Sequence, residues 1–371
     1  MPCRPLFSLL LPVLAACSAA PPHVPAPVAA PEPPATMGPV TVLEHYVSPP
    51  LPGEELDSLA FWQAADGPRV IASGKASHRL SVFNADTGER VRTFGGPDMF
   101  SRPNGVAVLP AGQGRDAALV FVVERDAKRV QAFALPGFTA AGSFGSDVLR
   151  SPYGIWLNPA AGGGVEAYVT DSFMDGARFD VVPPLAELAQ RVRRFRLAFD
   201  GAKVTATLAG SFGDTTPQGA LRVVESLAGD PSNDRLLVAD EYLGAGRHGS
   251  SLREYTLSGR YTGRSLPVGS FDAEAEGVVL WTCSARAAYW VAVDQLTPLT
   301  RFHVFQRDSL ALVGTWQGRT TADTDGIALH AQATPAFPAG ALFAVHQDKA
   351  LAAFDLAQVA RALRLPADCA R

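Results

Sequence analysis

The feature of this sequence that most constrains its fold is a short pattern that recurs six times. In each copy a polar residue precedes Gly or Ser, and three mostly apolar or small residues follow. The Gly or Ser positions are separated by 47, 49, 72, 51 and 49 residues, and the polar residues that precede them are Asp57, Asn104, Tyr153, Glu225, Glu276 and Asp325. Four of the five intervals match the roughly 40–50 residues of a propeller blade. The repeat therefore predicts a propeller.

Each copy of the pattern is followed by further strand-like runs. In the first repeat, β-branched and aromatic residues gather at 70–72, 80–83 and 91–94. Four short strands per repeat, separated by Gly, Pro and Asp turns, are typical of a propeller blade. A β-helix is the competing architecture, but its repeats are much shorter. We therefore predict an all-β, six-bladed β-propeller with four-stranded blades over residues 40–371.

Three segments depart from the regular repeat. The long third interval indicates an insertion, which we place at 173–190. The last repeat lacks a clear fourth strand, and residues 40–47, which precede the first repeat, are expected to supply it and close the ring. Residues 356–365 have a helical pattern and are expected to cap the bottom of the propeller.

The N-terminal residues have the character of an export signal. The apolar run from Leu6 to Ala16 is far shorter than the roughly 20 residues that span a bilayer. Residues 14–17, Leu-Ala-Ala-Cys, resemble the bacterial lipobox, so residues 1–17 are predicted to be a lipoprotein signal peptide with Cys17 as the lipid attachment site. Ser18 then favours sorting to the outer membrane, on its periplasmic or surface face. The alternative is an ordinary signal cleaved near Ala20.

Residues 18–39 are rich in Pro and Ala and are expected to form a stiff linker between that anchor and the propeller. The protein is thus expected to touch a membrane only through its lipid anchor. We expect it to act as a monomer.

Charge and cysteine content exclude several classes of protein. A net charge of −4 and a pI near 6.0 argue against a nucleic-acid binder, which would carry a basic stripe. Two of the four cysteines lie in the leader, so neither a disulfide-rich scaffold nor a cysteine-built zinc site is expected. Cys283 and Cys369 remain, and their spacing does not decide whether they pair.

The residues before the six Gly or Ser positions are expected to form one ring at a mouth of the central channel. Four of the six are carboxylates, and carboxylates crowded around one axis repel unless a cation lies between them. An oxygen-rich set without His or Cys favours Ca²⁺. Taken singly, each acid is as well explained by a turn before a strand. Four further acids are expected on or near the same face, namely Glu274, Asp323, Asp240 and Glu241. Basic residues such as Lys75 and Arg125 would suit an anionic ligand such as a phosphate.

Several of these segments resemble the β-propeller phytases, a family of calcium-dependent 3-phytases. The stretch 321–327, Thr-Ala-Asp-Thr-Asp-Gly-Ile, is similar to the family's S-D-T-D-G-I, and 338–348 resembles the strand that follows it. Glu274 and Glu276 stand where the family has D-x-E-G. Residues 224–230, 237–241 and 57–62 resemble T-E-G-M-A-A-D, the acid pair after it, and D-D-P-A-I-W. The similarity covers most of 40–365 in order.

The resemblance implies calcium-dependent hydrolysis of phosphomonoesters, above all phytate (inositol hexakisphosphate), by a metal-activated water. It implies Ca²⁺ as cofactor, with Glu225, Glu241 and Glu276 as the catalytic carboxylates. Metal ligands carried over from the family are Asp57, Glu225, Glu241, Glu274, Glu276, Asp323 and Asp325. The residues implied to contact substrate phosphate are Lys75, Arg125 and Tyr153.

Some positions differ from the phytase pattern. Ser58 replaces the second Asp of the D-D pair, and residues 170–172, Thr-Asp-Ser, replace a Lys-Glu pair. Asp171 is a substitute metal ligand, and Arg178 and Arg191 are candidates to replace the lost cation. Residues 102–108, Arg-Pro-Asn-Gly-Val-Ala-Val, also resemble NHL-type propellers, which are binding platforms. Gluconolactonase-like propellers, which are metal-dependent hydrolases, are a third interpretation.

Overall fold

The structure is a computed structural model that describes Met1 and residues 38–112, 115–159, 164–176, 181–244 and 249–371. Cys17 and the signal peptide, most of the linker and Arg178 lie outside the described residues. Residues 38–371 form one compact unit. The described part of the chain contains no helix that is long and apolar enough to cross a membrane.

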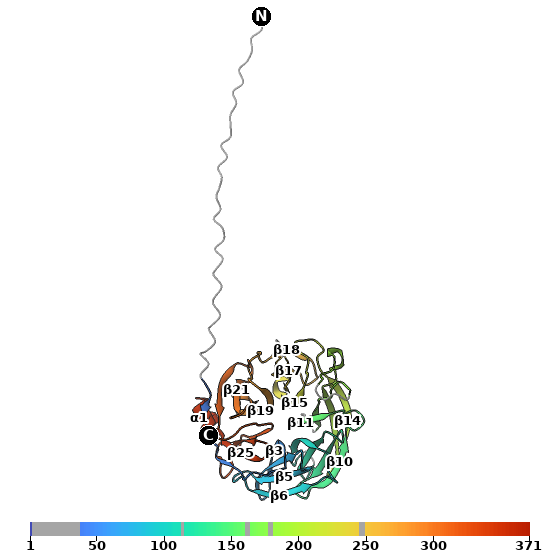
Figure 1. The fold of residues 1–371 in the computed structure, drawn as a ribbon, viewed down its shortest axis with the longest axis vertical. Helices are drawn as coiled ribbons and strands as arrows, with labels where there is room; N and C mark the ends of the chain where they lie inside the picture. The colour runs from blue at the N-terminus through green and yellow to red at the C-terminus, as the bar shows by residue number, and fades with distance from the viewer. Residues whose placement is uncertain (2–37, 113–114, 160–163, 177–180, 245–248) are drawn as a thin grey trace. The chain divides into compact units, whose positions relative to one another are not determined.

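Six antiparallel sheets are arranged as the blades of a ring (Figure 1), which confirms the predicted six-bladed propeller. In each of the first five blades the first strand along the chain is innermost. Blade one contains β3 (Leu56–Ala64), β4 (Gly67–Gly74), β5 (Arg79–Asn84) and β6 (Arg90–Gly95). Blade two contains β7 (Pro103–Leu109), β8 (Leu119–Glu124), β9 (Arg129–Ala134) and β10 (Thr139–Phe144). Blade three contains β11 (Pro152–Pro159), β12 (Val165–Asp171), β13 (Val192–Asp200) and β14 (Lys203–Phe212).

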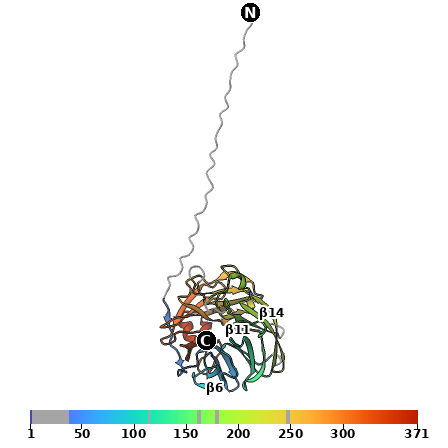
Figure 2. The same ribbon diagram turned by 45° about the vertical axis from the view of Figure 1, so that its right-hand side comes forward.

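The second half of the ring follows the same order. Blade four contains β15 (Val224–Asp230), β16 (Arg235–Asp240), β17 (Ser251–Tyr255) and β18 (Tyr261–Ser265). Blade five contains β19 (Glu274–Ser284), β20 (Ala287–Gln295), β21 (Arg301–Gln306) and β22 (Leu312–Gln317). Blade six contains β23 (Ile327–His330), β24 (Ala341–His346) and β25 (Ala350–Asp355). Figures 1 and 2 both show β11 inside the ring and β14 at its outer edge.

The ring is closed by a strand from before the first repeat, as predicted. Strand β2 (Tyr46–Val47) pairs with β25 and becomes the fourth strand of blade six. Strand β1 (Val40–Thr41) instead runs parallel to β22 and adds a fifth strand to blade five. The insertion also lies where it was expected, between the end of β12 and the start of β13. It contains the 3₁₀ turn η1 (Leu185–Glu187); a second such turn, η2 (Pro231–Asn233), follows β15.

The hydrophobic core is divided into six clusters, and each fills the space between two neighbouring blades. This is the expected result for a propeller, because every sheet buries both of its faces. Strands such as β8 and β24 are accordingly apolar along nearly their whole length. No single core holds the molecule together, so each blade depends on its two neighbours.

The C-terminal segment crosses from blade six to blade five at the end of the propeller opposite Glu274 and Asp325. Helix α1 (Leu356–Ala362) lies within the predicted helical stretch, and the turn η3 (Ala367–Ala370) follows it. The helix begins at Asp355, whose carboxylate accepts a hydrogen bond from the Ala357 amide at 2.8 Å. Cys369 forms a disulfide with Cys283 near the end of β19, which answers the pairing question that the sequence left open.

Candidate functional site

The six ring residues of the repeat all line one cavity of about 200 Å³ at a mouth of the central channel. Each of them lies at or just before the start of an innermost strand. The residues that follow second strands reach the same place, because the start of the first strand pairs with the end of the second, as Leu56 does with Gly74. This brings in Lys75, Arg125 and Glu241, together with Arg102.

The Gly or Ser of the repeat marks where the inner strands approach one another closely. A Cβ on Gly105 would stand 2.3 Å from the Tyr153 carbonyl oxygen, and one on Gly154 would stand 2.4 Å from that of Glu225. In each of the first five blades the pairing register also shifts around this position. Such a bulge turns the preceding side chain out of the regular alternation. The repeated pattern thus directs one side chain from each blade into the cavity.

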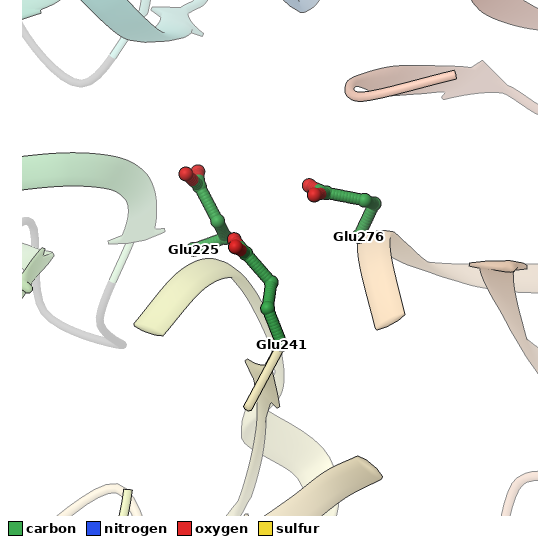
Figure 3. A group of neighbouring side chains, drawn as sticks. All are labelled: Glu225, Glu241 and Glu276. Carbon is green, nitrogen blue, oxygen red and sulfur yellow. The ribbon is translucent and has the colours of Figure 1, made fainter. Parts of the chain in front are cut away.

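Three of the carboxylates converge closely. Glu225 on β15, Glu241 just after β16 and Glu276 on β19 each offer an oxygen that lies within 4.8 Å of the other two (Figure 3). In the described part of the chain, no Lys or Arg forms a salt bridge with any of them.

Burial and mutual repulsion disfavour the charged forms of these glutamates. Burial, together with Glu274 and Asp325, raises the pKa of Glu241 well above its ordinary value. Burial and the neighbouring Glu241 do the same for the pKa of Glu276. A bound cation would reverse both effects, because it stabilises the charged forms.

Asp57 and Asp325 already have a partner. The Lys75 Nζ lies 3.2 Å from Asp325 Oδ2 and 3.6 Å from Asp57 Oδ1, and the Gln295 amide donates a hydrogen bond to Asp325. Burial and Asp57 still raise the pKa of Asp325 to about 7. Lys75, expected at the substrate phosphate, is therefore held between two of the expected metal ligands.

Two of the predicted metal ligands lie outside the cavity. Glu274 is half-buried, and burial together with Asp325 and Asp323 raises its pKa. Asp323 is exposed and has a backbone φ of 52°. Neither residue lines the cavity, but Glu274 interacts electrostatically with Asp323 and with Asp325, which does line it.

The structure argues against a functional role for several residues that replace or extend the phytase pattern. Asp171 is fully buried and bonded to the amides of Arg150 and Ser151. Asp240 is likewise buried, and its Oδ2 lies 3.1 Å from Arg253.

Arg191, a candidate for the lost cation, is also fully buried. Its guanidinium donates to backbone carbonyl oxygens, including those of Phe173 at 2.5 Å and Arg222 at 2.7 Å. It fixes the start of the insertion against blade four, and it is not available to a ligand. Asp171 and Asp240 instead have structural roles. The Asp171 carboxylate accepts hydrogen bonds from the loop before β11, and the Asp240 carboxylate accepts one from the Val223 amide just before β15.

Two residues at the cavity were not assigned a role from the sequence. Asn104 was placed in the ring but not among the ligand-binding residues; it is 1% exposed, and neither Oδ1 nor Nδ2 has a hydrogen-bond partner among the described residues. Arg102 was quoted only as part of a resemblance to NHL repeats. Its position two residues before Asn104 at a strand start was the available signal.

The donor set fits a hard divalent cation. It offers carboxylate and amide oxygens without His or Cys, as Ca²⁺ prefers. Glu241 Oε1 and Asp57 Oδ2 are buried without a hydrogen-bond partner in the described residues. Buried charged oxygens without partners are costly, so a cation among them would satisfy what the protein leaves unsatisfied.

Fold and site together define a six-bladed β-propeller with an acidic cavity at one mouth of its axial channel. No family model and no curated protein matches the sequence. The α-L-arabinanase of Penicillium chrysogenum, solved with arabinobiose, is similar in structure with a TM-score of 0.52 and 9% identity, over 85% of this chain and 98% of that one. A chain of a nidogen/laminin complex has a TM-score of 0.49 and 16% identity, over 75% and 85%. At such identities the likeness to the arabinanase shows a shared propeller fold.

Proposed function

We propose that the protein is a calcium-dependent phosphomonoesterase that acts on phytate or a related phosphorylated small molecule. The observation that carries the proposal is the convergence of Glu225, Glu241 and Glu276 in a cavity that also contains Arg125 and Tyr153. Such a cavity can bind a cation and an anionic group side by side. When bound, Ca²⁺ would neutralise phosphate oxygens and lower the pKa of a water molecule.

The size of the cavity limits what enters it. About 200 Å³ is less than the roughly 300–1,000 Å³ of pockets that enclose a whole small molecule. One phosphate group with its cation fits this space better than an entire inositol hexakisphosphate. The rest of such a substrate would lie at the rim, near Glu274 and Asp323.

The chain's own residues have distinct roles in this proposal. Arg125 and Tyr153, from blades two and three, bind and orient the phosphate. Glu241 has one carboxylate oxygen without a hydrogen-bond partner among the described residues, and a bound cation would favour its ionised form, which can accept a proton from water. Lys75 holds Asp57 and Asp325 in place, and its contact with substrate is secondary.

The proposal extends to residues 1–39 and to the location of the protein. We propose an exported lipoprotein with Cys17 as the anchor, on the outer membrane, that acts there as a monomer. Incorporation of a labelled fatty acid, and its loss in Cys17→Ser, tests the anchor.

The activity is tested by phosphate release from calcium phytate by the full chain, with and without a chelator. Calcium-dependent release supports the proposal. If calcium raises the melting temperature but no phosphate is released, the protein is a metal-stabilised binding propeller instead. A lactone substrate that is hydrolysed while phytate is not would favour the gluconolactonase-like alternative.

A further inference from the structure

The cavity is divided into two unlike halves around the axis. The innermost strands follow one another around the ring in chain order. Blades four, five, six and one contribute only carboxylates at the ring positions, namely Glu225, Glu276, Asp325 and Asp57. Blades two and three contribute the neutral side chains of Asn104 and Tyr153, and blade two adds the guanidinium groups of Arg102 and Arg125. Apart from Lys75, which lies between Asp57 and Asp325, the hydrogen-bond donors that line the cavity belong to blades two and three.

Asn104 is the least accessible member of the donor half. Its side chain is 1% exposed, lines the cavity, and has neither amide atom bonded to any described residue. Buried amides are almost always hydrogen-bonded, so one left unpaired beside a cavity indicates that the partner is a ligand. The bulge after Pro103 fixes the strand at this point.

Arg102 is held next to Asn104 in an uncommon backbone conformation. Its φ is 54°, which non-glycine residues rarely adopt and which is enriched at functional sites. Its Nη2 donates to Glu55 Oε1 at 3.0 Å, whereas its Nε is buried and has no hydrogen-bond partner in the part of the chain that the structure describes. The Arg125 amide donates to the Arg102 carbonyl oxygen at 3.2 Å, which keeps the two arginines together.

We propose that Asn104 and Arg102 are ligand-binding residues that, with Arg125, receive the phosphate group opposite the glutamates. Asn104 Nδ2 and Arg102 Nε donate to phosphate oxygens. The inference rests on the proposed function for the identity of the oxyanion. The phytase resemblance assigned neither residue, and the repeat placed Asn104 in the ring without a ligand-binding role.

The test uses the full chain loaded with Ca²⁺ and titrated with inorganic phosphate by calorimetry, with Ca²⁺ binding measured separately. Asn104→Asp keeps the shape of the side chain but replaces the donor with a negative acceptor. We expect phosphate affinity to fall at least tenfold and calcium affinity to be retained or increased. Arg102→Gln, at a partly exposed position, is expected to lower phosphate affinity about tenfold and serves if the first variant fails to fold.

Two matched controls separate binding from structure. Asn158→Asp changes another buried asparagine, 6% exposed, that does not line the cavity. Glu55→Gln removes the partner of Arg102 and leaves the guanidinium. Both are expected to bind phosphate at least as tightly as the unchanged protein.

Three results would overturn the inference: unchanged phosphate affinity in the folded variants, loss of calcium binding in Asn104→Asp, or no phosphate binding by the unchanged protein. Phosphate release from phytate tests the proposed function independently. Binding that depends on Asn104 without release would refute the activity but not the inference.

Discussion

At Glu276, burial and the like charges of neighbouring carboxylates both disfavour the ionised side chain. It is 8% exposed and its charged form is opposed by Glu241 and Asp325. We predict that Glu276→Gln raises the melting temperature of the calcium-free protein, because a neutral amide avoids the cost of burying a carboxylate among like charges. Each unit by which that pKa is raised corresponds to about 1.4 kcal/mol of this cost. The same change should abolish both the stabilisation by calcium and phosphate release. Calorimetric melting with and without Ca²⁺ measures both effects.

The control for this substitution is Glu89→Gln, which neutralises an exposed carboxylate far from the cavity in sequence and fold. It should change neither the calcium-free melting temperature nor the calcium response. A calcium response that survives in Glu276→Gln would remove this residue from the ligand set.

The raised pKa values also predict how stability depends on pH. In the calcium-free protein, burial and Asp57 raise the pKa of Asp325 to about 7, and burial and Asp325 raise that of Asp348 to about 6. The folded protein therefore binds more protons than the unfolded chain between these values and the ordinary ones. Its free energy of unfolding should therefore rise as the pH falls from 8 to 5. Since one unit of pKa shift is worth about 1.4 kcal/mol, the expected rise is a few kcal/mol.

Saturating calcium should reverse this dependence, since the cation binds only the ionised carboxylates. Urea unfolding at a series of pH values, with Ca²⁺ or with a chelator, measures the two slopes. Equal slopes under both conditions would show that calcium does not bind these groups.

At the scale of the strands, the close approach of β11 and β15 leads to a prediction about Gly154. Its missing Cβ leaves room for the Glu225 carbonyl oxygen. Gly154→Ala should destabilise the protein by about 1–3 kcal/mol, because packed backbone has to move apart. It should also weaken calcium binding, because Glu225 moves with that backbone. Gly164→Ala is the control, since a Cβ there meets nothing within 4 Å.

The strands also show which parts of the structure a sequence can predict. The repeat predicted the blades, the closing strand and the insertion, because period, turn residues and apolar runs are local properties. The sequence could not show which carboxylates face the cavity and which have a structural role. Asp240 and Glu241 are adjacent in sequence, yet one is bonded to Arg253 while the other faces the cavity. The pairing of β16 with β17 places Arg253 beside Asp240, and Glu241 is left to face the cavity.

The same limit explains the residues around Lys75 and Arg191. Both are basic residues near a strand end, and both were expected near a phosphate. Arg191 is instead enclosed by backbone carbonyls contributed in part by blade four, 30 residues away along the chain. Lys75 contacts Asp325 across 250 residues. Partners at such separations follow from ring closure and leave no local pattern in the sequence.

For the whole molecule, the disulfide predicts a separation between stability and function. Cys283 and Cys369 join β19 to the C-terminal segment across 86 residues, at the end of the propeller opposite the cavity. Cys369→Ser should lower the free energy of unfolding by about 2–4 kcal/mol, since loops of this length restrict the unfolded chain strongly. Calcium and phosphate binding should be unchanged.

Chemical unfolding with and without a reductant measures the loss, and Cys283→Ser is the matched variant. Both variants should lose the same amount and become insensitive to the reductant. A loss of calcium binding in either variant would mean that the two ends of the propeller are coupled.

The closure of the ring has a consequence for the order in which the molecule is made. Blade six combines β2, from the start of the domain, with three strands from its end, and the Leu351 amide donates to Ser48 Oγ across 303 residues. Strand β2 is therefore synthesised early, but β25, with which it pairs, is the last strand to be synthesised. A nascent chain cannot complete the last two inter-blade cores before that moment. A chain cut short before β25 therefore lacks the strand with which β2 pairs, and its ring cannot close.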